Sequence, residues 1–592
     1  MDTNNSDQAP VAPPTGARNT LWMVPYARNP YFTGREGELL EIAATLSAGT
    51  QGARSGGLAI SGAGGIGKTQ LALEYAYRSR EEYSHVFWVL AESRETFNAA
   101  YSDMAELLDL PGKRQQEQHL VNESLTDWLA HHSDWLLILD QLSDPALLKE
   151  FLPPAFSGYL LLTTRASTTD KLARRIRLKK LDAEESGHLL LRRAGILVGP
   201  EPLAEVLPKE YPAIRAIVDE LAGLPLTLDL AGAYLAETSC SLPAYLNLLR
   251  QEPVKRPSKR GELIEDQPGP LAQTVRLAYE KTAKPNPALA DLLRLCVFLA
   301  PDEIPGTLLS SCAPLLGKPL LKLAGNRTRW NAALEKLQKY GLIARDPELQ
   351  AVAMQREVQA ALLAMLSKEA QKLWAERVVR AVGSVSRSLP VEDQETWLLL
   401  MPHAHACLAL IERWQLNAVE GAWLLHHAGW YLHTRGEYAV AQAYEERALA
   451  IYRVACGDEH PSTAMMLNNL AVTYEDRGKL KEAANLHLQA LAIYRAHSDD
   501  ENPDAARCAY NLASLYQDQK RHDEARPLLE RALAIWETSN GPNHPNAKKA
   551  RARHEQLLQK PQDMRVTREP LESDEATKPE GLARVIRRGS IQ

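Results

Sequence analysis

Cysteine is scarce in this sequence, and its few copies are scattered. The chain has 592 residues and six cysteines, at positions 240, 296, 312, 407, 456 and 508. Because the sequence contains no CxxC pair and no cysteine–histidine cluster, we expect neither a zinc site nor a disulfide framework. Unpaired thiols are typical of the reducing cytoplasm, where we expect the protein to reside.

Long hydrophobic runs and aromatic residues are also few. No apolar run approaches the ~18 residues that cross a bilayer. The polar start MDTNNSDQAPVAPP lacks the apolar stretch of a signal peptide, so we expect no membrane association. Aromatic residues make up only 6% of the chain, and alanine and leucine are abundant beyond residue 180, which favours packed helices there. With a net charge of −6 and no basic recognition-helix pattern, a nucleic-acid partner is not expected.

The first third of the chain alternates between short apolar strands and helical patterns. The strands are predicted at 58–61, 85–90, 135–140, 159–164 and 175–181. Strands separated by helices in this way form a parallel sheet with helices on both faces. We therefore predict an α/β domain over 29–181, preceded by a flexible leader at 1–28. The pattern from 182 to 420 is mostly helical, with an exposed connector at 251–270 and a short hairpin around 341–354.

A repeat with a period of 42 residues follows. RALAIYR at 447–453 returns as QALAIYR at 489–495 and as RALAIWE at 531–537. The other positions in register are Ala441, Ala483 and Ala525, and Pro461, Pro503 and Pro545. A fixed period with two helices per unit predicts an all-α solenoid, which we place at 421–559 after a helical spacer at 366–420. The polar tail at 560–592 is expected to be mobile.

The segment LAISGAGGIGKTQLAL (58–73) contains Gly62, four residues, and then Gly67-Lys68-Thr69. In this pattern, glycines let backbone N–H groups point at phosphate oxygens, the lysine reaches the β- and γ-phosphates, and the threonine hydroxyl binds Mg²⁺. The strand before the loop and the helix after it supply the required context. The residues expected to bind the nucleotide here are Gly62, Gly64, Gly65, Gly67, Lys68, Thr69 and Gln70. The sequence therefore predicts an ATP or ADP site with Mg²⁺.

Three polar residues follow the later strands and are candidates for catalysis. Asp140 ends the strand WLLILD, where a carboxylate would join Thr69 in holding Mg²⁺. Asp144 would either polarise the attacking water or cap the next helix. Arg165 ends the strand YLLLTT, and its fixed cationic fork would sense the γ-phosphate; its alternative is a surface salt bridge.

Five motifs occur together in a familiar order. They are NPYFTGREGEL (29–39), GAGGIGKT (62–69), LLILD (136–140), LLLTTR (160–165) and GLPL (223–226). This set resembles the NB-ARC branch of the STAND nucleotide switches, to which many bacterial regulators belong. The downstream repeats resemble tetratricopeptide repeats of the kinesin-light-chain type, an array that bacterial NB-ARC proteins often carry.

The resemblance implies further roles and boundaries. Residues 29–181 would be the P-loop domain, 182–255 a helical lid, and 256–365 a winged-helix domain that packs on the nucleotide. Arg35, in Phe32-Thr33-Gly34-Arg35, would contact the adenine side, and Pro225 of GLPL would pack near the base from the lid.

The sequence departs from the family pattern at two positions. Gln141 stands where members often carry a second acid, which favours slow hydrolysis, and Gln355 stands where a histidine usually touches the bound diphosphate. Glutamine donates a hydrogen bond but carries no charge, so the diphosphate-bound state is expected to be held less firmly.

Asn469 and Asn511 occupy equivalent positions in successive repeats. They would either grip the backbone of a peptide ligand from the concave groove or join a packing layer between helices. We expect a nucleotide-dependent signalling switch that hydrolyses ATP slowly, senses a protein or peptide with its repeats, and self-assembles in the ATP state. Its effector is expected on a separate protein. The alternative is a repeat scaffold with a structural nucleotide.

Overall fold

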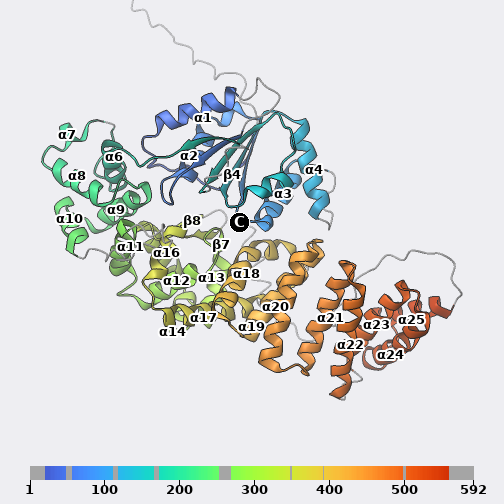
Figure 1. Cartoon of the computed structure of the whole chain (residues 1–592). Coiled ribbons are helices and arrows are strands. Elements are labelled where there is room, and N and C mark those ends of the chain that lie inside the picture. The colour runs from blue at the N-terminus through green and yellow to red at the C-terminus, as the bar shows by residue number, and fades with distance from the viewer. Residues whose placement is uncertain are drawn as a thin grey trace, which may run out of the picture. The chain divides into compact units, whose positions relative to one another are not determined.

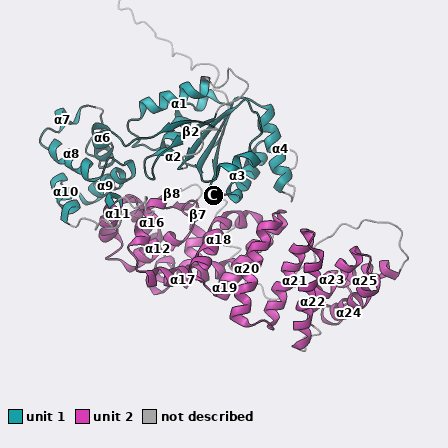
Figure 2. Ribbon diagram, in the orientation of Figure 1, with its two compact units in different colours: residues 1–271 teal, residues 272–592 magenta. Residues whose placement is uncertain are grey.

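The structure is a computed structural model that describes residues 20–48, 57–110, 118–165, 173–199, 201–251, 269–346, 350–390, 393–497 and 502–558. It divides into two compact units, residues 1–271 and 272–592 (Figure 2). Most of the expected leader and connector, and the tail at 560–592, lie outside the described residues.

A six-stranded parallel sheet forms the first unit's centre (Figure 1). Its strands are β1 (Leu21–Met23), β2 (Gly57–Ser61), β3 (His85–Leu90), β4 (Trp135–Leu142), β5 (Tyr159–Thr164) and β6 (Ala173–Arg177). They lie in the order β1-β3-β4-β5-β2-β6, and every neighbouring pair is parallel. The parallel sheet is thus confirmed, and the carboxyl ends of β2, β4 and β5 meet at one edge.

Strand β1 corrects the expected leader. Its residues pair with His85–Phe87 at the sheet edge, so residues 20–28 belong to the folded domain. Trp22 packs against Tyr77 with a ring separation of 5.0 Å, and the Arg80 guanidinium lies 4.7 Å from the same ring. Only three residues form the strand, too few for an alternation that sequence reading can recognise.

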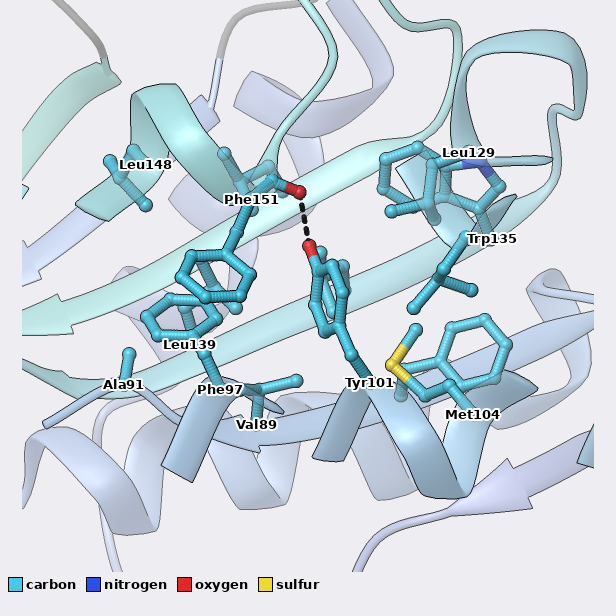
Figure 3. Close-up of a cluster of buried hydrophobic side chains, with 14 of the residues drawn as sticks. Val89, Ala91, Phe97, Tyr101, Met104, Leu129, Trp135, Leu139, Leu148 and Phe151 are labelled. Atoms are coloured by element: carbon cyan, nitrogen blue, oxygen red, sulfur yellow. Dashed lines mark hydrogen bonds between the residues drawn. The ribbon is translucent and has the colours of Figure 1, made fainter. Parts of the chain in front are cut away.

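Helices cover both faces of this sheet. On one face lie α1 (Glu36–Ala48) and α2 (Lys68–Arg78); on the other lie α3 (Arg94–Leu107), α4 (Gln118–His131) and the short α5 (Leu148–Phe151). Figure 3 shows the second of these cores, in which the Tyr101 hydroxyl donates a hydrogen bond to the Phe151 carbonyl. That bond satisfies the single polar atom of a fully buried ring.

The helical region after the sheet consists of α6 (Ala183–Arg193), α7 (Leu203–Val206), α8 (Tyr211–Glu220), α9 (Pro225–Thr238) and α10 (Leu242–Gln251). Helix α6 begins with a capping box, in which the side chains of Asp182 and Glu185 each accept from the other residue's backbone N–H. Helices α6 and α9 pack closely because Gly232 of α9 has no Cβ; one there would lie 2.6 Å from the Arg193 Cβ.

The second unit begins within α11 (Gly269–Thr282) and continues with α12 (Pro287–Phe298), α13 (Gly306–Cys312), α14 (Lys318–Ala324), α15 (Arg327–Lys339) and α16 (Arg356–Ala364). Strands β7 (Ile304–Pro305), β8 (Ala344–Asp346) and β9 (Ala351–Ala353) form an antiparallel sheet in the order β7-β9-β8. The pairing of β8 with β9 is the hairpin expected around 341–354.

Helices α17 (Lys368–Ser386) and α18 (Gln394–Trp414) lead into a regular array of helix pairs. The array contains α19 (Val419–Thr434), α20 (Tyr438–Cys456), α21 (Pro461–Asp476), α22 (Leu480–Ala496), α23 (Pro503–Asp518), α24 (His522–Asn540) and a final α25 (Pro545–Leu558). The three aligned alanines are fully buried, as close packing requires. Within the described ranges, no helix has the length and apolar character needed to cross a membrane.

Candidate nucleotide-binding site

The loop Gly62–Thr69 joins β2 to α2 through three glycines with positive φ. These are Gly62 (φ 156°), Gly65 (φ 70°) and Gly67 (φ 95°). Gly67 is the residue directly before α2, so the loop delivers the chain into the helix in a left-handed conformation that favours glycine. The backbone N–H groups at this helix start have no intrahelical partner and are suited to an anion. Gly64 lies in the turn between the flanking glycines.

Lys68 points back over its own loop. Its Nζ atom donates hydrogen bonds to the carbonyl oxygens of Gly62 and Ala63, each at 2.9 Å. The ammonium group is therefore placed above the loop, where it can exchange these neutral acceptors for phosphate oxygens.

Asp140 lies at the carboxyl end of β4 and is fully buried. The Thr69 hydroxyl donates to its carboxylate at 2.9 Å, and the Thr163 hydroxyl donates to the same oxygen at 2.5 Å. Burial raises the pKa of Asp140, whereas the hydrogen bonds from Thr163 and Thr69 and the Lys68 charge lower it. A buried carboxylate beside a threonine hydroxyl fits Mg²⁺, which prefers hard oxygen ligands and would offset the cost of burial. The structure thus brings Thr69 and Asp140 into contact, as expected, and their binding of Mg²⁺ stays a prediction.

Gln141 lies at a bulge in β4. Its φ is 60°, the register with β5 shifts between Leu139 and Leu142, and its N–H donates to the Thr163 hydroxyl at 2.8 Å. Asp144 is exposed, and its carboxylate accepts from the Ala146 N–H at 2.8 Å, which caps the short turn Pro145–Leu147. The structure thus shows the capping alternative for Asp144; a role with water stays a prediction.

Arg165 follows β5 at the same edge of the sheet and is exposed. Gln70, in the first turn of α2, accepts at 2.8 Å from the side-chain amide of Asn29. The Arg193 guanidinium lies over the Tyr31 ring, 5.0 Å from the ring centroid. Segment 29–35 is therefore attached both to the helix that follows the phosphate loop and to helix α6.

Arg35 is buried and holds several backbone segments together. Its guanidinium donates to Glu38 at 2.7 Å, to the Lys179 carbonyl at 2.6 Å and to the Ile66 carbonyl of the phosphate loop at 3.5 Å. Its backbone N–H donates to the Glu185 carboxylate at 3.1 Å. The Arg35 side chain thus links the loop to the segment that leads into α6; its expected contact with adenine stays a prediction.

Helix α9 touches the phosphate loop directly. The Leu226 N–H donates to the Gly65 carbonyl at 3.3 Å, and a Cβ on Gly67 would lie 3.8 Å from the Pro225 ring. Behind this contact, the Leu181 N–H donates to the Gly223 carbonyl at 3.3 Å. Sequence reading singled out Pro225 but missed Leu226, because a bond made by a backbone N–H leaves no mark in the side-chain pattern.

The aligned asparagines of the repeats, Asn469 and Asn511, both form hydrogen bonds with the Asn468 side chain. Asn469 lies 3.1 Å from the His426 ring nitrogen and accepts from the Asn468 amide at 3.2 Å, and Asn511 donates to Asn468 at 3.2 Å. These bonds connect α19, α21 and α23 and favour the packing alternative. Gln355, in the second unit, is exposed at the start of α16, and its diphosphate contact stays a prediction.

The loop, the Asp140 and Thr69 side chains beside it and the parallel sheet give the first unit the fold of a P-loop NTPase. Residues 35–195 match the family model of the NB-ARC domain. Residues 419–496 and 505–546 match tetratricopeptide-repeat models, and residues 280–371 match a domain of unknown function, DUF7779. Residues 35–195 therefore form an NB-ARC domain, and tetratricopeptide repeats follow it in the same chain.

Two similar proteins carry related descriptions. A nucleotide-binding leucine-rich repeat (NLR)-like protein of Hyaloscypha variabilis is 26% identical over 482 residues, which cover 75% of this chain and 46% of that protein. The chain thus spans about half the length of this curated relative. A STAND signal-transduction ATPase with a tetratricopeptide-repeat sensor from Pyrococcus horikoshii has 15% identity and a TM-score of 0.36, over 92% of this chain and 88% of that one. A bacterial source stays a prediction.

Proposed function

We propose that this chain is an ATP- and ADP-dependent signalling switch. ATP binds with Mg²⁺ at Gly62–Thr69, with Lys68 on the β- and γ-phosphates and with Thr69 and Asp140 holding the metal. The bound Mg²⁺ neutralises charge on the phosphates. Arg165, which follows β5 at the same edge of the sheet, senses the γ-phosphate. The hydrogen bond from Thr69 to Asp140 supports this assignment, because it brings both metal ligands within 2.9 Å.

The observation that carries the switch proposal is the contact between the Leu226 N–H and the Gly65 carbonyl. Phosphates bind to the backbone of this loop, so the nucleotide and the helical lid interact with the same few residues. A ligand shifts a conformational equilibrium only if it has different affinities for the two states. Binding at the loop meets this condition, since ATP and ADP differ in the contacts that they make beside Gly65 and Lys68.

The repeat array binds a protein or peptide partner and transmits its presence to the nucleotide-binding part. In the ATP state the chain self-assembles, and its effector is a separate protein. Hydrolysis is slow because Gln141 replaces an acid, and it returns the switch to its resting state. Support for this part comes from the NB-ARC and repeat matches and from the absence of a carboxylate at Gln141.

Nucleotide binding is tested by comparing the variant Lys68→Ala with the unaltered chain. Removing the ammonium group is expected to weaken the binding of a fluorescent ATP analogue at least about 100-fold, since a charge-assisted contact to phosphate contributes roughly 3 kcal/mol. Lys149→Ala, which changes an exposed lysine of α5, is the matched control. Equal affinities of Lys68→Ala and the unaltered chain would refute the site.

The second candidate is a repeat scaffold with a structural nucleotide. The hydrogen bonds of Asn469 with His426 and of Asn511 with Asn468 favour it, because the residues expected to grip a partner bond to other side chains of the array instead. The two functions differ in one measurable property: a scaffold binds its partner equally well with ADP and with an ATP analogue. Partner-dependent assembly that persists in Lys68→Ala would support the scaffold over the switch.

A further inference from the structure

Successive side chains of β3 alternate between the two cores of the sheet. Those on the side of α3 and α4 are Phe87, Val89 and Ala91, of which Figure 3 labels the last two. Those on the side of α1 and α2 are Val86 and Trp88. Because neighbouring side chains of a strand point to opposite faces, each later residue can be assigned a face as long as the strand pairing continues.

Strand β4 follows the same rule. Leu137 and Leu139 join the core of α3 and α4, and Leu136 and Ile138 join the core of α2. Asp140 therefore lies on the α2 face, as its hydrogen bond with Thr69 confirms. The α2 face at the carboxyl edge is thus the side on which the phosphates bind.

Hydrogen bonds between the two chain segments continue beyond Leu90, the last residue of β3. Leu90 pairs with Asp140. Beyond it, the Ala91 N–H donates to the Asp140 carbonyl at 2.7 Å, and the Ala91 carbonyl accepts from the Ser143 N–H at 3.3 Å. Ala91 is fully buried in the core of α3 and α4. The same alternation places the next residue, Glu92, on the α2 side, two residues beyond the Leu90–Asp140 pair.

The backbone of Glu92 is fixed at this position. The Ser143 hydroxyl donates to its carbonyl oxygen at 2.5 Å, and helix α3 begins just afterwards with the cap residue Ser93. The side chain is half-buried. Adjacent strands are roughly 4.8 Å apart, so the backbone of Glu92 lies one strand across from β4 and two residues beyond Leu90, the partner of Asp140.

We propose that Glu92 is the general base for hydrolysis at this site, an inference that rests on the proposed function. Gln141 cannot take up a proton at neutral pH, and Asp144 is exposed and bonded to a backbone N–H. Glu92 shares both the strand edge and the sheet face of Asp140. Hydrolysis stays slow without an acid at position 141, and Glu92 supplies its base catalysis from the neighbouring strand.

In the step itself, a water molecule attacks the γ-phosphorus of ATP. The water gives its proton to the Glu92 carboxylate as its oxygen bonds to phosphorus, and the bond from the γ-phosphorus to the β–γ bridging oxygen breaks. ADP leaves with the electron pair on that oxygen. Glu92 then returns the proton to solvent, so that ATP and water become ADP, inorganic phosphate and one proton. General-base assistance of this kind contributes about 10²- to 10⁴-fold.

The test is Glu92→Gln in the full chain, with Glu95→Gln of α3 as the matched control. We expect the affinities of Glu92→Gln for ADP and for a non-hydrolysable ATP analogue to stay within about twofold of the unaltered chain, while single-turnover hydrolysis falls at least about 100-fold. The melting temperature and its rise with ADP report folding independently of hydrolysis. Glu92→Asp, which keeps a base but shortens it, is expected to retain intermediate activity.

A pH profile separates a base from a structural residue. The single-turnover rate of the unaltered chain should rise with pH as a carboxyl group ionises, and this rise should be missing from Glu92→Gln. Unchanged hydrolysis in Glu92→Gln, or an equal loss of nucleotide affinity and rate, overturns the inference. So does a chain that binds ATP without hydrolysing it, although the switch would then stand, because Lys68→Ala tests it by binding alone.

Discussion

The carboxyl group of Glu445 is buried within the repeat array, and replacing it changes how stability depends on pH. Glu445 lies on α20 with 3% of its surface exposed, and Gly429 of α19 packs against it. Burial raises its pKa to about 8, and the nearby Thr473 hydroxyl lowers the pKa only in part. The folded state therefore binds a proton that the unfolded state releases above about pH 4.5, and stability falls as the pH rises from 4.5 to 8.

The size of this effect follows from linkage. With a pKa of about 8 when folded and 4.5 when unfolded, Glu445 lowers the free energy of unfolding by about 3 kcal/mol between pH 5 and pH 7.5. Glutamine has nearly the same shape as glutamate but no titrating proton, so Glu445→Gln should not show this loss. Over the same pH interval, the free energy of unfolding of Glu445→Gln should therefore rise by about 3 kcal/mol relative to that of the unaltered chain. Hydrogen exchange of the slowest amides in α20 and α21, corrected for intrinsic rates, measures the change. Glu482→Gln, which removes an exposed carboxylate of α22, is the control. If the stability of Glu445→Gln and of the unaltered chain changed in parallel with pH, Glu445 would not carry the proton in the folded state.

Two glycine substitutions test close contacts elsewhere. Gly65→Ala places a Cβ 3.2 Å from the Leu226 Cβ at a φ of 70°, so we expect at least about 1 kcal/mol of strain and roughly fivefold weaker ADP binding by titration calorimetry. Gly383→Ala places a Cβ against the Glu420 carbonyl where α17 meets α19 and should cost about 2 kcal/mol or more, seen as a lower melting temperature. Gly37→Ala, in helix α1 with open space around it, is the control for both and should leave each measurement unchanged or slightly improved. Full ADP affinity in Gly65→Ala, or an unchanged melting temperature in Gly383→Ala, would contradict the respective contact.

Several features of the fold and site were predictable because they depend on local chemistry. The glycine spacing identified the loop at 62–69, and the apolar run before Asp140 placed that carboxylate at the end of a buried strand. Parallel pairing then brought Asp140 and Thr69 to one edge. The 42-residue period likewise set the helix pairs, since α19, α21, α23 and α25 begin at 419, 461, 503 and 545.

The rest depended on contacts between distant residues. Strand β1 is held by pairing with β3, more than 60 residues away, and its three residues carry no periodicity of their own. The Arg35 guanidinium bonds to the Lys179 carbonyl, a backbone acceptor that any residue would supply. Glu92 went unnoticed because its face of the sheet follows from strand register, which single-sequence patterns do not contain.

In the proposed switch, the nucleotide at Gly62–Thr69 sets the state of the whole chain. The most direct measurement is the native mass of the purified protein with Mg²⁺–ADP and with a Mg²⁺-bound non-hydrolysable ATP analogue, in the presence of its repeat-binding partner. The account predicts a larger assembly with the analogue than with ADP, and no such difference in Lys68→Ala. A single mass under both nucleotides would contradict it.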